Sequence, residues 1–175
     1  MFKTQRMDID IIVKSTKEYE ICKNDEVIIK GFKPKWYSSE SHFFFNNQTY
    51  EIKKKSFFSS EFNIFKSGKL RGEFVHNWKT GYAFKLLDAN KSTHSYSMKV
   101  EKPNGWLKND LLCTLFDDNN NAVLSIRYVW IKWKASMQAE IIDSVYENYE
   151  LLVYTLMLFK LYQQAQSAGA GMVSY

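Results

Sequence analysis

The sequence predicts a mainly β protein, a closed antiparallel β-barrel of about 12 strands around a central hydrophobic C-terminal helix. Aromatic residues, which suit the pleated surface of a sheet, are abundant: 13 Phe, 11 Tyr and 5 Trp stand against 2 Pro. Turn-forming residues recur at the spacing of about 8–12 residues that is typical of all-β sandwiches and barrels. One continuous apolar run near the C-terminus breaks this rhythm and indicates a buried helix.

The first strands are predicted from short alternating segments between turn signals. Pro34 places a bend within Lys33–Ser41, because proline cannot donate to a strand ladder. Asn46-Asn47 is a hairpin signal that ends the fourth strand. Lys23-Asn24-Asp25 joins the second strand to the third. The four expected strands are Met7–Val13, which we expect at a sheet edge, Tyr19–Cys22, Glu26–Phe32 and His42–Phe45.

From residue 49 onward the strands and turns become regular. Ser67-Gly68 marks a tight hairpin, and the run Asp117–Asn121 is the clearest hairpin loop in the chain. Such short loops imply antiparallel neighbours. The expected strands are Thr49–Lys53, Phe62–Phe65, Leu70–Val75, Tyr82–Leu87, Tyr96–Val100, Leu111–Phe116, Ala122–Tyr128, Trp130–Trp133 and Ala135–Ile141.

The segment Glu147–Ser167 is predicted to be helical, since it lacks Gly, Pro and two-residue alternation. Asn148 is the expected N-cap, and Gly169 and Gly171 are expected to stop the helix, which leaves 168–175 as a flexible tail. No linker divides the chain, so residues 1–175 are expected to form one domain.

The stretch Leu151–Tyr162 reads LLVYTLMLFKLY, in which ten of the twelve residues are apolar or Tyr. At 100° per residue these side chains point in every direction, so the helix must be buried all round. The run is shorter than the roughly 20 residues that span a bilayer, which favours a core helix without a transmembrane span. The side chains expected to fill the barrel include Leu151, Leu152, Leu156, Met157 and Phe159.

Two segments carry a resemblance to a known superfamily: YEIKKKSFFSSEFNIFKSGKLRGEF at Tyr50–Phe74 and ELLVYTLMLFKLY at Glu150–Tyr162. The chain from about Thr49 to Ser167 resembles the tubby C-terminal-like barrel, the superfamily of tubby-like, LURP-one-related and phospholipid scramblase proteins. The resemblance implies a 12-stranded barrel around a hydrophobic helix, binding of membrane lipid including phosphoinositides, and no settled enzymatic activity. The chain lacks the cysteine-rich, Pro-rich and acidic calcium-loop segments of scramblases, which argues against scramblase activity.

The positive charge is concentrated in one part of the chain. The net charge is +5, and residues 49–108 alone sum to +7. Such a basic region is typical of proteins with an anionic partner, such as lipid headgroups or nucleic acid, but a solvated lysine-rich barrel exterior is the simpler explanation. The candidate headgroup ligands are Lys53, Lys54, Lys55, Lys66, Lys69 and Arg71, with Phe57-Phe58 at the tip of the first loop.

The sequence contains no recognisable catalytic, cofactor or metal motif. His42, His76 and His94 lack metal-ligand spacing, and no nucleophile elbow, Walker A or dinucleotide fingerprint occurs. We therefore expect a non-enzymatic binding or scaffold protein without cofactors, and no nucleic-acid partner. The alternatives are a lipocalin-like carrier of small hydrophobic ligands and an enzyme of unrecognised class.

The polar start of the chain and its two cysteines bear on location. The first ten residues do not read as a signal peptide, and Cys22 and Cys113 are expected to be free thiols. We therefore expect a cytoplasmic protein that is peripheral at the inner membrane surface. The tryptophans at 78, 106, 130 and 133 are expected in the core or at the barrel rim rather than on a binding surface.

Overall fold

The structure is a computed structural model that describes residues 8–15, 17–34, 40–56, 59, 61–77, 81–88, 91–103, 110–131, 134–142 and 149–170. The strands are β1 Asp8–Val13, β2 Glu18–Lys23, β3 Glu26–Phe32, β4 Ser41–Phe45, β5 Gln48–Lys54, β6 Phe62–Lys66, β7 Lys69–Asn77, β8 Gly81–Leu87, β9 Thr93–Glu101, β10 Leu111–Phe116, β11 Ala122–Ile131 and β12 Lys134–Ile141. One helix follows them, α1 at Tyr149–Ala170.

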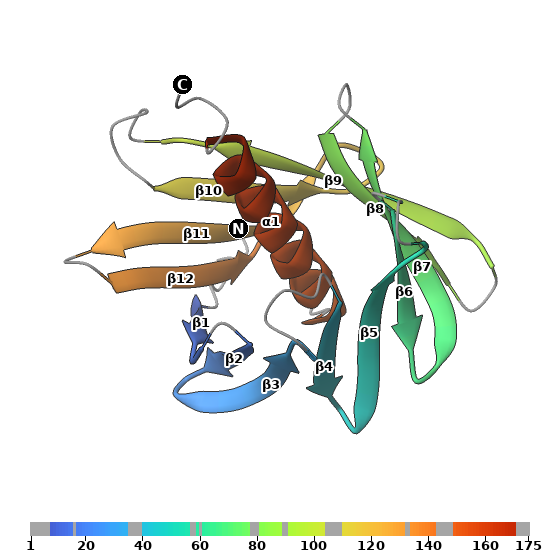
Figure 1. Cartoon of the computed structure of the whole chain (residues 1–175), viewed down its shortest axis with the longest axis horizontal. Coiled ribbons are helices and arrows are strands. Elements are labelled where there is room, and N and C mark those ends of the chain that lie inside the picture. The colour runs from blue at the N-terminus through green and yellow to red at the C-terminus, as the bar shows by residue number, and fades with distance from the viewer. Residues whose placement is uncertain are drawn as a thin grey trace, which may run out of the picture.

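The strands form one closed barrel in which each strand is antiparallel to its chain neighbours (Figure 1). Closure comes from β1 and β12, which pair from Asp8 opposite Glu140 to Ile11 opposite Met137. The predicted fold class, a closed antiparallel barrel with a C-terminal helix, is confirmed. The prediction that Met7–Val13 is an edge strand is wrong, because β1 also pairs with β2 and a closed barrel has no edge.

Tight turns lie where the Asn, Asp and Gly pairs predicted them. Each of three hairpins has two successive turn residues with positive φ, which is the backbone that matches the right-handed twist of paired strands. These pairs are Asn24 and Asp25, Asn46 and Asn47, and Ser67 and Gly68. The turn chemistry therefore fixes which strands become neighbours.

Two differences concern the end of the β region and the ends of the helix. Trp130–Trp133 is not a separate strand, since Trp130 and Ile131 continue β11 and pair with β12. The helix runs through Gly169 to Ala170, so residues 168–170 belong to it and not to a tail. Residues 143–148, including the expected N-cap, and residues 171–175 lie outside the described part of the chain.

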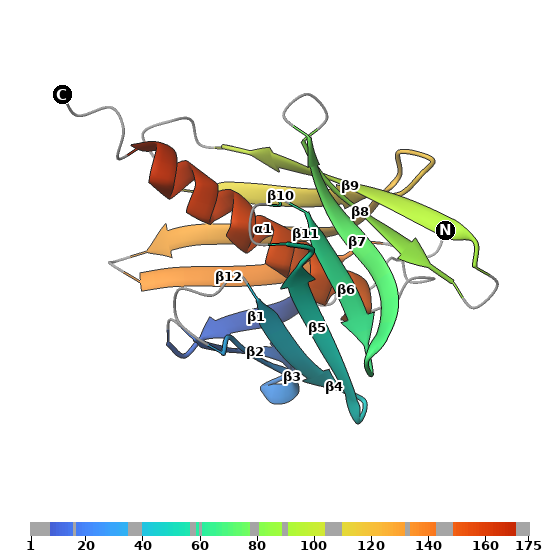
Figure 2. The same ribbon diagram turned by 45° about the vertical axis from the view of Figure 1, so that its right-hand side comes forward.

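The helix passes through the barrel and is buried over its first half (Figure 2). The nine consecutive residues Leu151–Phe159 are each at most 1% exposed, so every face of this segment is covered. Exposure returns gradually, and residues 164–166 face solvent. In the part of the chain that the structure describes, no helix combines the length and the apolar character needed to cross a bilayer.

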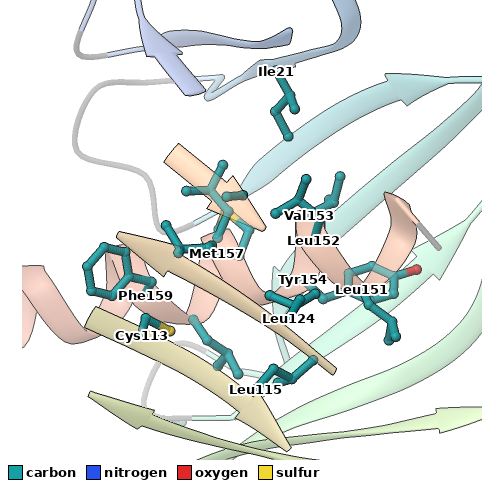
Figure 3. Close-up of a cluster of buried hydrophobic side chains, with 14 of the residues drawn as sticks. Ile21, Cys113, Leu115, Leu124, Leu151, Leu152, Val153, Tyr154, Met157 and Phe159 are labelled. Carbon is teal, nitrogen blue, oxygen red and sulfur yellow. The ribbon is translucent and has the colours of Figure 1, made fainter. Parts of the chain in front are cut away.

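Inward side chains of the strands fill the space between the barrel wall and the helix. Figure 3 shows Cys113, Leu115 and Leu124 among the side chains that gather around α1. Tyr154 packs edge-on against Tyr50, Phe74 and Phe84, with ring centroids 5.8–6.3 Å apart. Such edge-to-face pairs contribute about 0.5–1.5 kcal/mol each beyond their buried area.

Because the strands alternate in direction, the segments that connect them alternate between the two ends of the barrel. We call the end where α1 begins the helix-start end; it receives connections 24–25, 46–47, 67–68, 88–92, 117–121 and 142–148. We call the opposite end, toward which α1 leaves the barrel, the helix-exit end. It receives connections 14–17, 33–40, 55–61, 78–80, 102–110 and 132–133.

Candidate functional site

The six basic residues predicted as headgroup ligands do not gather at one place. Strand β6 pairs Phe62 with Lys54 at the helix-exit end and Lys66 with Tyr50 toward the helix-start end. Lys53, Lys54 and Lys55 therefore lie toward the helix-exit end, whereas Lys66, Lys69 and Arg71 lie toward the helix-start end. Phe57 and Phe58 lie outside the described residues.

Two of these lysines form ion pairs on the outer wall. The Lys53 ammonium lies 2.6 Å from the Glu51 carboxylate. Lys55 donates to Glu61 at 2.7 Å and to Glu73 at 2.6 Å. Pairs this exposed contribute at most about 1 kcal/mol, but they neutralise the charge that a headgroup would meet.

Lys66 and Arg71 are directed into the barrel. Lys66 continues the inward alternation of Phe62 and Ile64, both of which are buried. Arg71 occupies a β-bulge, where Ile64 pairs with Gly72 while the next residue of β6 pairs with Leu70. A bulge re-aims a side chain, and here both cations reach the same carboxylate.

That carboxylate belongs to Glu150 in the first turn of α1. Glu150 is only 8% exposed; it accepts hydrogen bonds from Lys66 and, at 3.0 Å, from the Tyr50 hydroxyl, and the Arg71 Nε lies 3.8 Å from it. Burial and, next, the Glu150 charge raise the pKa of Tyr50, so its hydroxyl stays protonated and donates. A carboxylate at a helix N-terminus also suits the helix dipole. This cluster ties α1 to the barrel wall.

A second charged cluster lies toward the helix-exit end and contains two lysines. Lys33 follows β3 and continues its ladder, since its amide donates to the Lys17 carbonyl at 2.8 Å. Its side chain therefore follows the inward positions of Ile29 and Gly31, and it is only 9% exposed. Lys160 approaches from the helix, with its ammonium 3.4 Å from the centroid of the Tyr19 ring.

Gly31 leaves room for the Tyr19 ring, over which the Lys160 ammonium lies. Gly31 lies opposite Tyr19 in the β2–β3 ladder, and a Cβ at this position would come within 2.2 Å of the Tyr19 ring. The missing side chain lets the ring lie against β3, and the rings of Tyr19 and Phe43 form a T-shaped pair with their centroids 5.1 Å apart. The π face of Tyr19 is thereby presented to the Lys160 ammonium as a cation–π partner.

Both lysines lie in surroundings that disfavour a positive charge. Burial, and next the neighbouring charge of Lys33, lower the pKa of Lys160 to about 7. Burial also lowers the pKa of Lys33. Among the described residues, neither ammonium has a carboxylate within ion-pair distance. At neutral pH this end of the interior therefore holds more positive charge than its own side chains compensate.

We expect Lys160→Met to stabilise the protein near neutral pH. The folded chain binds fewer protons than the unfolded one between the lowered pKa of about 7 and the ordinary 10.5, so wild-type stability rises with pH across that window. The cost of the buried charge is therefore fully present below about pH 7. The variant should gain about 2–3 kcal/mol in unfolding free energy at about pH 6 and much less at about pH 9.5. Urea denaturation at both pH values measures this, and a pH-independent difference would contradict it.

The remaining titratable groups do not assemble a reactive centre in the described part of the chain. Cys22 and Cys113 are free and buried, and burial raises the pKa of both thiols. His42 and His94 each lie 3.6 Å from one carboxylate, of Glu51 and Asp88 respectively. No group of three or more His, Cys, Asp or Glu side chains that could hold a metal is found among the described residues.

Comparison with protein families, with curated proteins and with solved structures finds no match to this chain. The charged clusters therefore rest on geometry alone. The sequence alone does not single out Glu150, Lys160 or Lys33 as site residues. The inward alternation of β6 was a signal for Lys66. The pairing of Lys33 with Lys160 has no local signal, because it depends on the path of α1. Trp78, Trp106, Trp133 and the side chain of Trp130 lie outside the description.

Proposed function

We propose that the protein is a non-enzymatic binding or scaffold protein of the tubby-like barrel type. It acts on the cytoplasmic side of a membrane and binds anionic, phosphoinositide-like headgroups at the helix-exit end of the barrel. The observation that supports this most is a charge difference between the two ends. The described residues of the connecting segments sum to +2 at the helix-exit end and to −3 at the helix-start end.

Exposed lysines at the helix-exit end are suited to contact a headgroup layer. Lys17, Lys54 and Lys102 are exposed, and within the described residues none of them has an ion-pair partner. A lysine near an anionic bilayer contributes about 1 kcal/mol of attraction.

The interior of the barrel argues against the carrier alternative. A lipocalin-like protein holds its ligand in the lumen. Here α1 occupies that space, and the side chains from Leu151 to Phe159 are almost completely buried. A ligand is therefore expected at an end of the barrel.

We expect the double variant Lys17→Glu with Lys54→Glu to lose binding to vesicles that contain phosphatidylinositol phosphates. Removing two attractive charges, at about 1 kcal/mol each, should weaken the partition coefficient at least about tenfold. Co-sedimentation with vesicles at low salt measures it, since salt screens such attraction. The matched control is Lys69→Glu with Lys91→Glu, two exposed lysines at the helix-start end. Equal losses in both variants, or no binding by the wild type, would refute the proposed surface.

A further inference from the structure

The paired lysines inside the helix-exit end lack a negative partner among the described residues. Lys33 reaches this place from the end of β3, and Lys160 reaches it from α1. The Tyr19 ring lies under the Lys160 ammonium, and its hydroxyl lies 3.9 Å from the Met157 sulfur. None of these neighbours supplies a negative charge, because burial raises the pKa of Tyr19 as well.

The contrast with the other end of the helix shows what is missing. At the helix-start end, Lys66 and Arg71 share the carboxylate of Glu150. At the helix-exit end two lysines lie on either side of the same ring: Lys160 is over the Tyr19 ring, and Lys33 is the next inward position after Gly31, which lies opposite Tyr19. No carboxylate forms an ion pair with either of them in the described residues. Like charges in a low-dielectric interior repel, and an anion between them relieves both the repulsion and the loss of hydration.

We infer that Lys33 and Lys160 form the seat of a phosphate group that enters the barrel at the helix-exit end. A phosphomonoester carries a charge of about −1.5 to −2 at neutral pH, which balances two ammonium groups, whereas a carboxylate balances one. Lysine is a common phosphate ligand that acts as a compact point charge with rotatable donors. The Tyr19 ring, which lies against Gly31, positions the Lys160 ammonium. The hydrogen bond from the Lys33 amide to the Lys17 carbonyl positions the backbone of Lys33.

A lipid headgroup and a free phosphate would offer this seat the same chemistry. That the phosphate belongs to a lipid headgroup rests on the proposed function. The seat is distinct from the exposed lysines of the outer rim, because Lys33 and Lys160 are mostly enclosed. The outer lysines attract a surface from a distance, whereas the seat binds one group in contact.

Calorimetric titration with inorganic phosphate and with soluble inositol trisphosphate tests the seat on the full chain. We expect saturable binding of one anion, weakened at least about tenfold in Lys33→Met and in Lys160→Met. Lys160→Arg should keep most of the affinity, and the exposed-site control Lys69→Met should match the wild type. Removing a buried charge should leave both Met variants folded, which thermal unfolding checks.

The outcomes separate the seat from the membrane surface. Absence of binding by both anions, or equal affinity in all variants, would overturn the seat even if vesicles still bind. Binding of inorganic phosphate without any vesicle binding would support the seat with a free phosphate as its ligand, and would remove the proposed membrane function. Preference for inositol trisphosphate, together with weaker vesicle binding by Lys160→Met, would support the seat with a lipid headgroup as its source.

Discussion

A chain that ends at residue 148, and therefore lacks α1, is expected to have no cooperative unfolding transition. The nine residues Leu151–Phe159 are each at most 1% exposed, and burying each of the eight apolar or aromatic side chains among them contributes about 1.5–3 kcal/mol. Their sum, roughly 12–24 kcal/mol, is as large as or larger than the roughly 5–15 kcal/mol by which a domain is stable. The strands would remain wrapped around an apolar space too large for their own side chains to fill.

Circular dichroism and urea denaturation measure this result. A chain that ends at residue 170 is the control, because it keeps the whole of α1. The single variant Leu156→Ala should remain folded but lose about 2–5 kcal/mol, since Leu156 is fully buried. A cooperative transition in the chain without α1, at the urea concentration of the control, would show that the barrel does not depend on its helix.

Replacing Glu150 by alanine is expected to cost about 3 kcal/mol of unfolding free energy. The change leaves Lys66 and Arg71 directed into the barrel without their common carboxylate, and removal of one partner from a buried ion pair costs about 3–5 kcal/mol. Both cations keep some exposure, 30% and 26%, which places the cost at the lower end of that range. Urea denaturation at neutral pH measures it.

Two controls separate the missing charge from simple loss of contacts. Lys55→Ala removes an exposed lysine with two carboxylate partners and should cost less than about 1 kcal/mol. The double variant Glu150→Leu with Lys66→Leu should recover part of the loss, because apolar side chains often replace a buried pair at little cost. If Glu150→Ala costs no more than Lys55→Ala, the cluster does not hold the helix to the wall.

The parts of the fold that were predictable are those with local causes. The strand Glu26–Phe32 and the strand Leu111–Phe116 have the predicted bounds, since Asn and Asp residues precede both strands and either Pro34 or Asp117 follows closely. The prediction of a separate strand at Trp130–Trp133 is wrong because alternation alone does not show where a long strand ends. The helix passes Gly169, since one glycine costs only about 1 kcal/mol in a helix.

The candidate site was less predictable, because its members meet only in the closed barrel. The prediction of one basic patch joined residues that are close in sequence, such as Lys55 and Lys66. An antiparallel strand carries such neighbours to opposite ends of the molecule. The cluster around Glu150 combines β5, β6, β7 and α1, and the pair of Lys33 and Lys160 combines β3 and α1. Closure and helix direction decide these meetings, and no short sequence window contains them.

The seam between β1 and β12 has a consequence for how the protein is made. Strand β1 cannot pair with β12 until β12, which begins at Lys134, has been synthesised. The helix that fills the lumen is synthesised later still. Such distant pairing raises the contact order of a barrel whose other strand pairs join consecutive strands, and a higher contact order slows folding. At about 5–20 residues per second, the ribosome would hold a growing sheet with two open edges for several seconds. Cells that synthesise this protein therefore have reason to shield the nascent chain from aggregation until α1 has left the ribosome.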